Sequence, residues 1–478
     1  MQPAGRDNEA LSRQGSHGDP ALLMLQELES RLAASDGGQD KEGTQDSCEA
    51  EYPFVPQPQS LEELGVSSDL VAELALKEIF FGNRATGVEV SHALATNYAI
   101  VRDALDYLRR ATLIDRIGSD GPMEQLNVYA LTASGRDKVD EILLRSRYRG
   151  PVPVPFDQYC RVVKQQPLRK HLVTPDELRQ GLSHLVFDQK ILDVLGPALR
   201  SGDSIFLYGP PGNGKTSLAT SLGRILGRHQ LIPQAVTANG QIIKVFDPAI
   251  HEALTPADVS HLRMPFSFRD YDGPEHRRDP RWVPCVRPSI VVGGEVTMDR
   301  LDLTYDDHLC YHLAPLQMKA NGGILVIDDF GRQRVPPADM LNRWIVPMDR
   351  GVDYLALRTG ETIELPFDLL LVFATNLRPT DLVDEAYLRR LRYKILISNP
   401  KEDEYREIFR RAAAKRQLVV DEDLLDYFIG RYYKKAGREM RAYHPIDVMG
   451  YVGDISRYQG QPPHLSREIL DLAADCLF

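Results

Sequence analysis

The chain has 478 residues, of which 43% are hydrophobic and 26% charged, a composition typical of folded globular proteins. Its five scattered cysteines form no CxxC pair, which excludes a disulfide scaffold and predicts a reducing, cytoplasmic location. No apolar run approaches the roughly 18 residues that cross a bilayer, and no secretory signal is visible, so membrane insertion is not expected. The formal net charge of −11 is concentrated in residues 1–60, with 11 acidic and 4 basic side chains. The remainder is near neutral, so no long-range field would attract nucleic acid.

The first 60 residues are predicted to form an acidic, mostly disordered tail, because they are rich in Gly, Ser, Gln and Asp. One stretch, 21–34, has leucines near one helical face after an Asp-Pro start. It is either a docking helix for a partner or a marginal helix in a solvated tail.

Residues 61–150 are predicted to form a separate domain. The expected helices cover 70–81, 87–94 and 98–110 and begin again at Ser134, and the expected strands cover 113–117 and 127–131. This order resembles a winged helix, and the phrase YALTASGR at 129–136 is common in bacterial members. The helix over 98–110 is predicted to expose residues that could touch a DNA groove, namely Asn97, Tyr98, Arg102, Asp106, Arg109 and Arg110. Because the domain carries 14 acidic and 11 basic residues, protein docking or positioning in an oligomer is favoured over DNA binding.

The rest of the chain divides into three further parts. Residues 151–171 begin with the proline-punctuated RGPVPVPF stretch and are predicted to be a linker. Strand and helix patterns alternate over 172–398, whereas 399–478 has helical patterns only. In this last part Asn399 and Pro400 are expected to start the first helix.

Residues 204–220 (SIFLYGPPGNGKTSLAT) combine an apolar strand, a Gly/Pro loop and a helix, in the spacing G-x-x-x-x-G-K-[ST]. Such a loop wraps main-chain N–H groups around phosphates at the positive end of a helix. A lysine then meets the β/γ oxygens, and a hydroxyl ligates Mg²⁺. The candidate nucleotide-binding residues are Gly209, Pro210, Pro211, Gly212, Asn213, Gly214, Lys215, Thr216 and Ser217, with Thr216 also a metal ligand.

Two later strands end in polar side chains that suit the same chemistry. The segment GILVIDD ends in Asp328, which is predicted to hold Mg²⁺ through water, and Asp329, which is predicted to polarise the attacking water. The segment LLLVFATN ends in Asn376, whose amide could orient that water or sense the γ-phosphate.

These motifs, followed by D-x-A-x-L-R-R-x-R-[FY] at 384–393, make residues 172–478 resemble an AAA+ ATPase. The resemblance implies an α/β P-loop AAA+ core with a parallel sheet, a C-terminal helical lid at 399–478, and here an N-terminal winged-helix-like domain. It also implies ATP and Mg²⁺ as cofactors, Asn376 as a sensor, and a homo-oligomeric ring, usually a hexamer. An arginine of the last motif then reaches the neighbouring subunit's nucleotide. Arg390 and Arg392 are the best candidates by position, and Arg389 is the third.

A finer resemblance concerns the region before Asn376. The stretch ANGG at 320–323 and a predicted hairpin over 353–367 resemble the MoxR-like branch, which has a hairpin before the first sensor.

Two residues depart from the family pattern. Asp329 stands where the family usually has Glu, and the shorter side chain either slows hydrolysis or is compensated by a backbone shift. Ile446 stands where many relatives have a lid arginine, so either Arg438 or Arg441 substitutes for it or the site works without one. Near the start of the core, 185–188 is expected to flank the adenine.

The 111 residues between Thr216 and Asp328 exceed what one strand–helix step needs. Their loop 269–288 contains basic and aromatic residues that could grip nucleic acid or peptide, namely Arg277, Arg278, Arg281 and Trp282. Because nearby acids cancel the charge, a solvated surface loop is favoured. His308, Cys310 and His312 alternate as metal ligands could, but this signal is weak without a paired motif, and ordinary packing is the default.

We therefore expect a cytoplasmic AAA+ motor that hydrolyses ATP and remodels a protein client recruited by the N-terminal domain. The alternative is a DNA-binding regulator in which ATP acts as an assembly switch and hydrolysis is slow. Asp329 and Ile446 favour the alternative, and the charge balance of residues 61–150 disfavours it.

Overall fold

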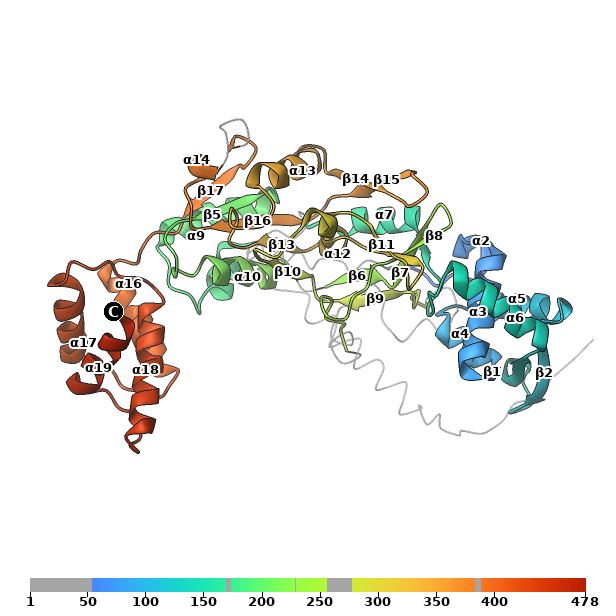
Figure 1. Cartoon of the computed structure of the whole chain (residues 1–478), viewed down its shortest axis with the longest axis horizontal. Helices are drawn as coiled ribbons and strands as arrows, with labels where there is room; N and C mark the ends of the chain where they lie inside the picture. The colour runs from blue at the N-terminus through green and yellow to red at the C-terminus, as the bar shows by residue number, and fades with distance from the viewer. Residues whose placement is uncertain (1–53, 169–172, 228, 256–276, 383–387) are drawn as a thin grey trace, which may run out of the picture. The chain divides into compact units, whose positions relative to one another are not determined.

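The computed structural model describes residues 54–168, 173–227, 229–255, 277–382 and 388–478 (Figure 1). Most of the predicted tail, including the possible helix over 21–34, lies outside the described residues. So do part of the 269–288 loop and residue Asp384 of the arginine-rich motif. Among the described residues, no helix is both long and apolar enough to cross a membrane.

The N-terminal unit contains every helix and strand predicted for residues 61–150. Ser67 caps α3 by accepting from the Leu70 N–H, and Thr86 forms a reciprocal capping box with Glu89 at α4. The strands pair antiparallel in the order β1-β3-β2. The elements are α2 (Leu61–Leu64), α3 (Ser68–Gly82), β1 (Ala85–Thr86), α4 (Gly87–Ala93), α5 (Tyr98–Arg110), β2 (Ile114–Ser119), η1 (Glu124–Leu126), β3 (Asn127–Leu131) and α6 (Ala133–Arg145).

The exposed face predicted for α5 is confirmed for Arg102, Arg109 and Arg110, whereas Asn97, Tyr98 and Asp106 are only partly exposed. Asn97 caps the helix and also donates to Gln59, and the Tyr98 hydroxyl is buried. Arg102 is paired with Asp103 and Arg109 with Asp106, at 3.2 and 3.4 Å. Each of these two arginines therefore has an acid of its own helix beside it.

Residues 151–168, the described part of the predicted linker, are folded. They contain β4 (Val154–Pro155), which pairs parallel with β7, and α7 (Phe156–Gln165). Tyr159, Val162 and Val163 of α7 are buried. The prolines are compatible with this arrangement because β4 is a very short strand at the edge of its sheet, where a missing N–H is tolerated.

A parallel sheet in the order β10-β13-β16-β5-β17 forms the centre of the α/β core (Figure 1). Its side chains alternate between two buried faces, so that Ile205 and Leu207 pack with α9 and α10, whereas Phe206 packs with α12 and α13. Its strands are β5 (Ile205–Tyr208), β10 (Ser289–Val292), β13 (Ile324–Ile327), β16 (Leu370–Thr375) and β17 (Tyr393–Leu396). Its helices are α8 (Pro175–Gly181), α9 (Gln189–Ser201), α10 (Lys215–Ile225), α12 (Leu316–Ala320), α13 (Pro337–Arg350) and α14 (Pro379–Leu382).

The long insert between α10 and β13 builds a second sheet, in the order β11-β12-β8-β7-β4. Strands β7 and β8 serve two cores at once. Ala235 and Ile242 pack into the core of the N-terminal unit, whereas Val236 and Ile243 pack into the core of the insert. The insert strands are β6 (Gln230–Pro233), β7 (Ala235–Ala238), β8 (Gln241–Lys244), β9 (Trp282–Cys285), β11 (Thr304–Asp306) and β12 (Tyr311–Leu313), with the turn η4 (Met298–Leu301).

The described end of the 269–288 loop is solvated only in part, because Arg277 is exposed. Arg281 and Trp282 are both buried, and the Arg281 guanidinium pairs with Asp279 at 2.8 Å. Arg281 also donates to the Leu64 carbonyl oxygen at 3.3 Å, in the N-terminal unit. Asp279 therefore cancels the charge of Arg281 by direct pairing inside the protein. His312, from the alternating His308, Cys310 and His312, packs in the protein interior: it is buried against Tyr305 and contacts the Gln241 amide. Among the described residues, no cluster of His, Cys, Asp and Glu could hold a metal ion.

A hairpin and a helical unit complete the fold. The hairpin of β14 (Val352–Ala356) and β15 (Thr362–Pro366) lies where one was predicted. In the last unit, α16 begins at Glu402 and is capped by Lys401, so the expected start at Asn399 and Pro400 is wrong. The helices of this unit are α16 (Glu402–Ala414), α17 (Glu422–Ile429), the π-helical turn η5 (Gly430–Lys434), α18 (His444–Tyr458) and α19 (Arg467–Leu477).

Candidate nucleotide-binding site

Three polar segments meet where strands of the parallel sheet end. Strand β16 lies between β5 and β13, so the loop after β5, the acids after β13 and Asn376 after β16 share one edge of the sheet. They line a cavity of about 630 Å³ together with residues of the helical unit. From the predicted set, the lining includes Pro211, Gly212, Asn213, Gly214, Lys215, Thr216, Ser217, Asp328, Asp329 and Asn376.

The loop between β5 and α10 depends on glycines. Gly209, Gly212 and Gly214 have φ values of 139°, 80° and 81°, in a region that side chains rarely adopt. A Cβ on Gly209 would lie 2.2 Å from the Ile397 carbonyl oxygen. Among the described residues, the main-chain N–H groups of residues 212–216 donate to no partner. They therefore form a set of free donors at the N-terminus of α10, where the helix dipole favours an anion.

Lys215 is held inside the loop. Its ammonium group donates to the carbonyl oxygens of Gly209 and Pro210, at 2.9 and 2.8 Å. Burial lowers the pKa of Lys215, and the nearby carboxylates of Asp328 and Asp329 oppose that shift. A buried cation held by carbonyl oxygens is poised for a stronger anionic partner such as phosphate.

Thr216 and the two acids after β13 are directly connected. The Thr216 hydroxyl donates to the Asp328 carboxylate at 2.8 Å, and the Asp329 N–H donates to the other oxygen of Asp328 at 2.9 Å. Asp329 itself has a φ of 48°, a left-handed conformation that Asp tolerates better than most residues. The Asn376 amide donates to the Asp329 carboxylate at 3.3 Å. The Thr216 hydroxyl and the carboxylates of Asp328 and Asp329 thus lie side by side.

The opposite side of the cavity comes from the helical unit, here called the lid (residues 399–478). The Asn213 side chain accepts from the Ala442 N–H at 3.1 Å and donates to Asn399 at 2.8 Å. The Tyr443 N–H donates to the Gly212 carbonyl oxygen at 3.0 Å. Asn399 therefore connects the loop to the lid instead of capping α16.

The lid presents two arginines that sequence reasoning missed. Arg411 and Arg416 of the α16 region line the cavity, whereas Arg438 and Arg441 do not. Arg416 donates to the carbonyl oxygen of Ile446 at 3.4 Å, next to the position where relatives are expected to carry arginine. No sequence motif marks Arg416, because it lies in the turn after α16, far in sequence from Ile446 on α18. Leu185, Val186 and Phe187, from the segment expected beside adenine, also line the cavity.

The predicted arginine-finger candidates lie outside this cavity. Arg390 pairs with Asp349 at 3.3 Å, and Arg392 pairs with Asp203 at 2.6 Å. Arg389 is exposed. None of the three lines the cavity of its own chain.

Comparison with known proteins assigns little. Residues 401–476 match a family described as a domain of unknown function (DUF8689), and no curated protein matches. Among solved structures, the RuvB Holliday junction branch migration motor of Thermotoga maritima is 16% identical, over 61% of this chain and 70% of that one, with a TM-score of 0.36. Two of its point mutants are 15% identical, with TM-scores of 0.36 and 0.34; they cover 62% and 65% of this chain, and the chain covers 71% and 73% of them. TM-scores below 0.5 are too low for these likenesses to assign an activity. The chain has an α/β fold with a parallel sheet, and the glycine-containing loop between β5 and α10 lies at one edge of that sheet.

Proposed function

We propose that this chain is an AAA+ ATPase that binds and hydrolyses Mg-ATP. One observation carries the proposal: the free N–H groups of residues 212–216, Lys215, the Thr216–Asp328 pair and the Asp329–Asn376 pair line one cavity. Phosphate binding needs the first two of these features, and metal-assisted hydrolysis needs the others.

The residues present fit both ligands. The loop amides and Lys215 would hold the phosphates, and the Thr216 hydroxyl with Asp328 would hold Mg²⁺. When bound, Mg²⁺ neutralises charge that develops on the transferred phosphoryl group. Asp329 would accept a proton from the attacking water, and Asn376 would orient the Asp329 carboxylate and that water. Leu185 and Phe187 offer apolar surface for the adenine ring of the nucleotide.

We further propose that the chain works as a hexameric ring, in which Arg390 or Arg392 completes the neighbour's site. The proposal is supported by the position of both arginines outside their own cavity. The N-terminal unit, with its winged-helix-like order of elements, would recruit a protein client. The β14–β15 hairpin agrees with the MoxR-like branch of the family. DNA binding is disfavoured because Arg102 and Arg109 already have acidic neighbours on α5.

The test is steady-state ATP hydrolysis at increasing protein concentration, with and without duplex DNA. A motor should show turnover per subunit that rises with assembly and ignores DNA. Lys215→Ala should abolish nucleotide binding, whereas Lys190→Ala, a matched change of an exposed lysine on α9, should not. Salt-sensitive, ATP-dependent DNA binding with slow turnover would instead favour the switch. Absence of any nucleotide binding by the wild-type chain would overturn the proposal.

A further inference from the structure

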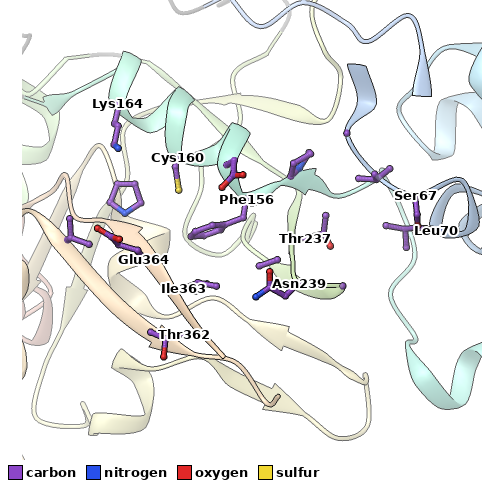
Figure 2. A pocket seen from close by; sticks show the side chains of 18 of the residues that line it. Ser67, Leu70, Phe156, Cys160, Lys164, Thr237, Asn239, Thr362, Ile363 and Glu364 are labelled. Atoms are coloured by element: carbon purple, nitrogen blue, oxygen red, sulfur yellow. Dashed lines mark hydrogen bonds between the residues drawn. The ribbon is translucent and has the colours of Figure 1, made fainter. Parts of the chain in front are cut away.

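A second, larger cavity lies away from the nucleotide site. It measures about 910 Å³ and is lined by the α2–α3 junction, α7, the β7–β8 turn and strand β15 (Figure 2). On α7, Phe156, Cys160 and Lys164 recur every fourth residue, so one face of the helix lines the cavity while the opposite face is buried. Figure 2 shows Thr362 and Glu364 on the hairpin and Thr237 and Asn239 near the β7–β8 turn around the same space.

The edge of β15 in this cavity has main-chain groups without partners. At the two ends of the hairpin, Phe367 N–H donates to the Gly351 carbonyl oxygen and Leu357 N–H to the Glu361 carbonyl oxygen. Hydrogen-bonded and non-bonded pairs alternate along an antiparallel ladder. Counting from either end, Thr362 and Glu364 fall in non-bonded pairs with Ala356 and Tyr354. Their N–H and C=O groups therefore point away from β14, and they meet no partner among the described residues.

The charge of the lining is unbalanced. Asp69, Asp157 and Glu364 form no ion pair within the described part of the chain, and Lys164 is the lining's only cation. A fourth acid, Glu73, already pairs with Arg145 at 3.1 Å. Burial raises the pKa of the Cys160 thiol to about 11, so this residue adds no charge at neutral pH. The chain's own tail is acidic and is therefore a poor occupant.

We propose that this cavity receives an extended, lysine- or arginine-bearing segment of a partner protein, which pairs with the edge of β15. Main-chain hydrogen bonds to Thr362 and Glu364 would supply affinity, as in other cases of strand addition. Asp69, Asp157 and Glu364 would select basic side chains, and Phe156, Leu70 and Ile363 would contact the apolar side chains between them. The inference deepens the proposed function by giving the client a chemical class, and it does not require ATP hydrolysis.

Binding is tested on the full chain without nucleotide, by fluorescence anisotropy with labelled peptides of about ten residues. The probes are an alternating Lys-Val peptide, an alternating Glu-Val peptide, and the Lys-Val peptide N-methylated at alternate residues. The wild-type chain should bind the first at least about tenfold more tightly than the other two, because charge and main-chain donors both contribute. Equal affinity for the Glu-Val peptide would overturn the charge argument, and equal affinity for the N-methylated peptide would overturn strand pairing. No binding of the Lys-Val peptide would overturn the whole inference.

Variants locate the binding. The double change Asp157→Lys and Glu364→Lys should weaken Lys-Val binding at least about tenfold, whereas Asp475→Lys, at an exposed position of α19, should not change it. Thr362→Pro removes only an outward N–H at the start of β15, and a several-fold loss is expected. Unchanged affinity in the double variant would place the peptide elsewhere.

Nucleotide binding, measured on the same samples, separates the two proposals. Lys215→Ala should retain peptide affinity. If the wild-type chain hydrolyses ATP but does not bind the Lys-Val peptide, only the inference is contradicted. If it binds the peptide but neither binds nor hydrolyses ATP, only the proposed function is contradicted.

Discussion

At the scale of single residues, Asp329 is the side chain on which hydrolysis is expected to depend most. Its left-handed backbone is the kind of local adjustment that could compensate for a side chain shorter than Glu. The Asn376 amide, 3.3 Å away, fixes one carboxylate oxygen. An aspartate here is therefore compatible with turnover.

Asp329→Asn keeps the shape of the side chain but removes the base. Turnover should fall by about 10²-fold or more, with nucleotide affinity nearly unchanged, because general bases contribute on this scale. The measurement is ATPase rate beside a nucleotide titration. Asp339→Asn, an exposed change on α13, is the control. Undiminished turnover in Asp329→Asn would assign the base elsewhere.

Arg416 is predicted to supply the lid cation that Ile446 cannot. Arg416→Ala should weaken ATP binding about tenfold, since a charge-assisted hydrogen bond to phosphate is lost. The effect should be smaller for ADP if the guanidinium meets the γ-phosphate. Arg438→Ala, whose guanidinium packs over the Phe478 ring, is the matched lid variant. Equal affinities for Arg416→Ala and the wild type would leave the lid without a phosphate contact.

At the scale of elements, the start of α18 is held by a buried chain of hydroxyl and imidazole groups. Tyr405 contacts Tyr433, and Tyr433 contacts Nδ1 of His444, each at 2.8 Å. His444 follows Tyr443, whose N–H holds the Gly212 carbonyl oxygen. The packing of the lid interior thus fixes the segment that touches the phosphate loop.

The buried hydrogen bonds of His444 predict that the stability of the protein depends on pH. Burial lowers the pKa of His444 from 6.5 to about 4, so the unfolded chain binds a proton that the folded chain excludes between these values. Neutral His444 makes its full contribution to the free energy of unfolding above pH 6.5. That free energy falls by up to about 3 kcal/mol as the pH is lowered toward 4. Urea unfolding at several pH values, compared with His444→Gln, isolates it from the other histidines. A difference between the two proteins that does not change with pH would contradict the assignment.

Local patterns were sufficient for elements whose partners are near in sequence. Helical patterns in the sequence predicted α3, α4 and α5, and the strand–loop–helix motif predicted β5, the glycine loop after it and α10. Long-range partners defeated the same reasoning. Asn399 has the sequence of a cap but binds Asn213, 186 residues away. The sequence predicts that Arg281 and Trp282 are solvated, because the partners of the arginine, Asp279 and the Leu64 carbonyl oxygen, become evident only in the structure. Arg416 lines the site only because α16 packs against α18.

At the scale of the whole molecule, the proposed ring makes each site depend on two chains. Lys215→Ala and Arg390→Ala should each be inactive alone, because the first lacks nucleotide and the second lacks the neighbour's cation. Mixing them should restore part of the turnover, since some interfaces then join an intact loop to an intact arginine. If Arg390→Ala keeps full activity, the mixture is repeated with Arg392→Ala. No recovery with either arginine would indicate a site complete within one chain.

Strands β7 and β8 also decide how this protein can be dissected. Because alternate side chains of these strands enter two separate cores, removing residues 1–150 would leave Ala235 and Ile242 facing water. A shortened chain that begins near residue 151 should therefore expose an apolar surface and tend to aggregate. Expression of residues 151–478 on their own will need polar replacements at those two positions.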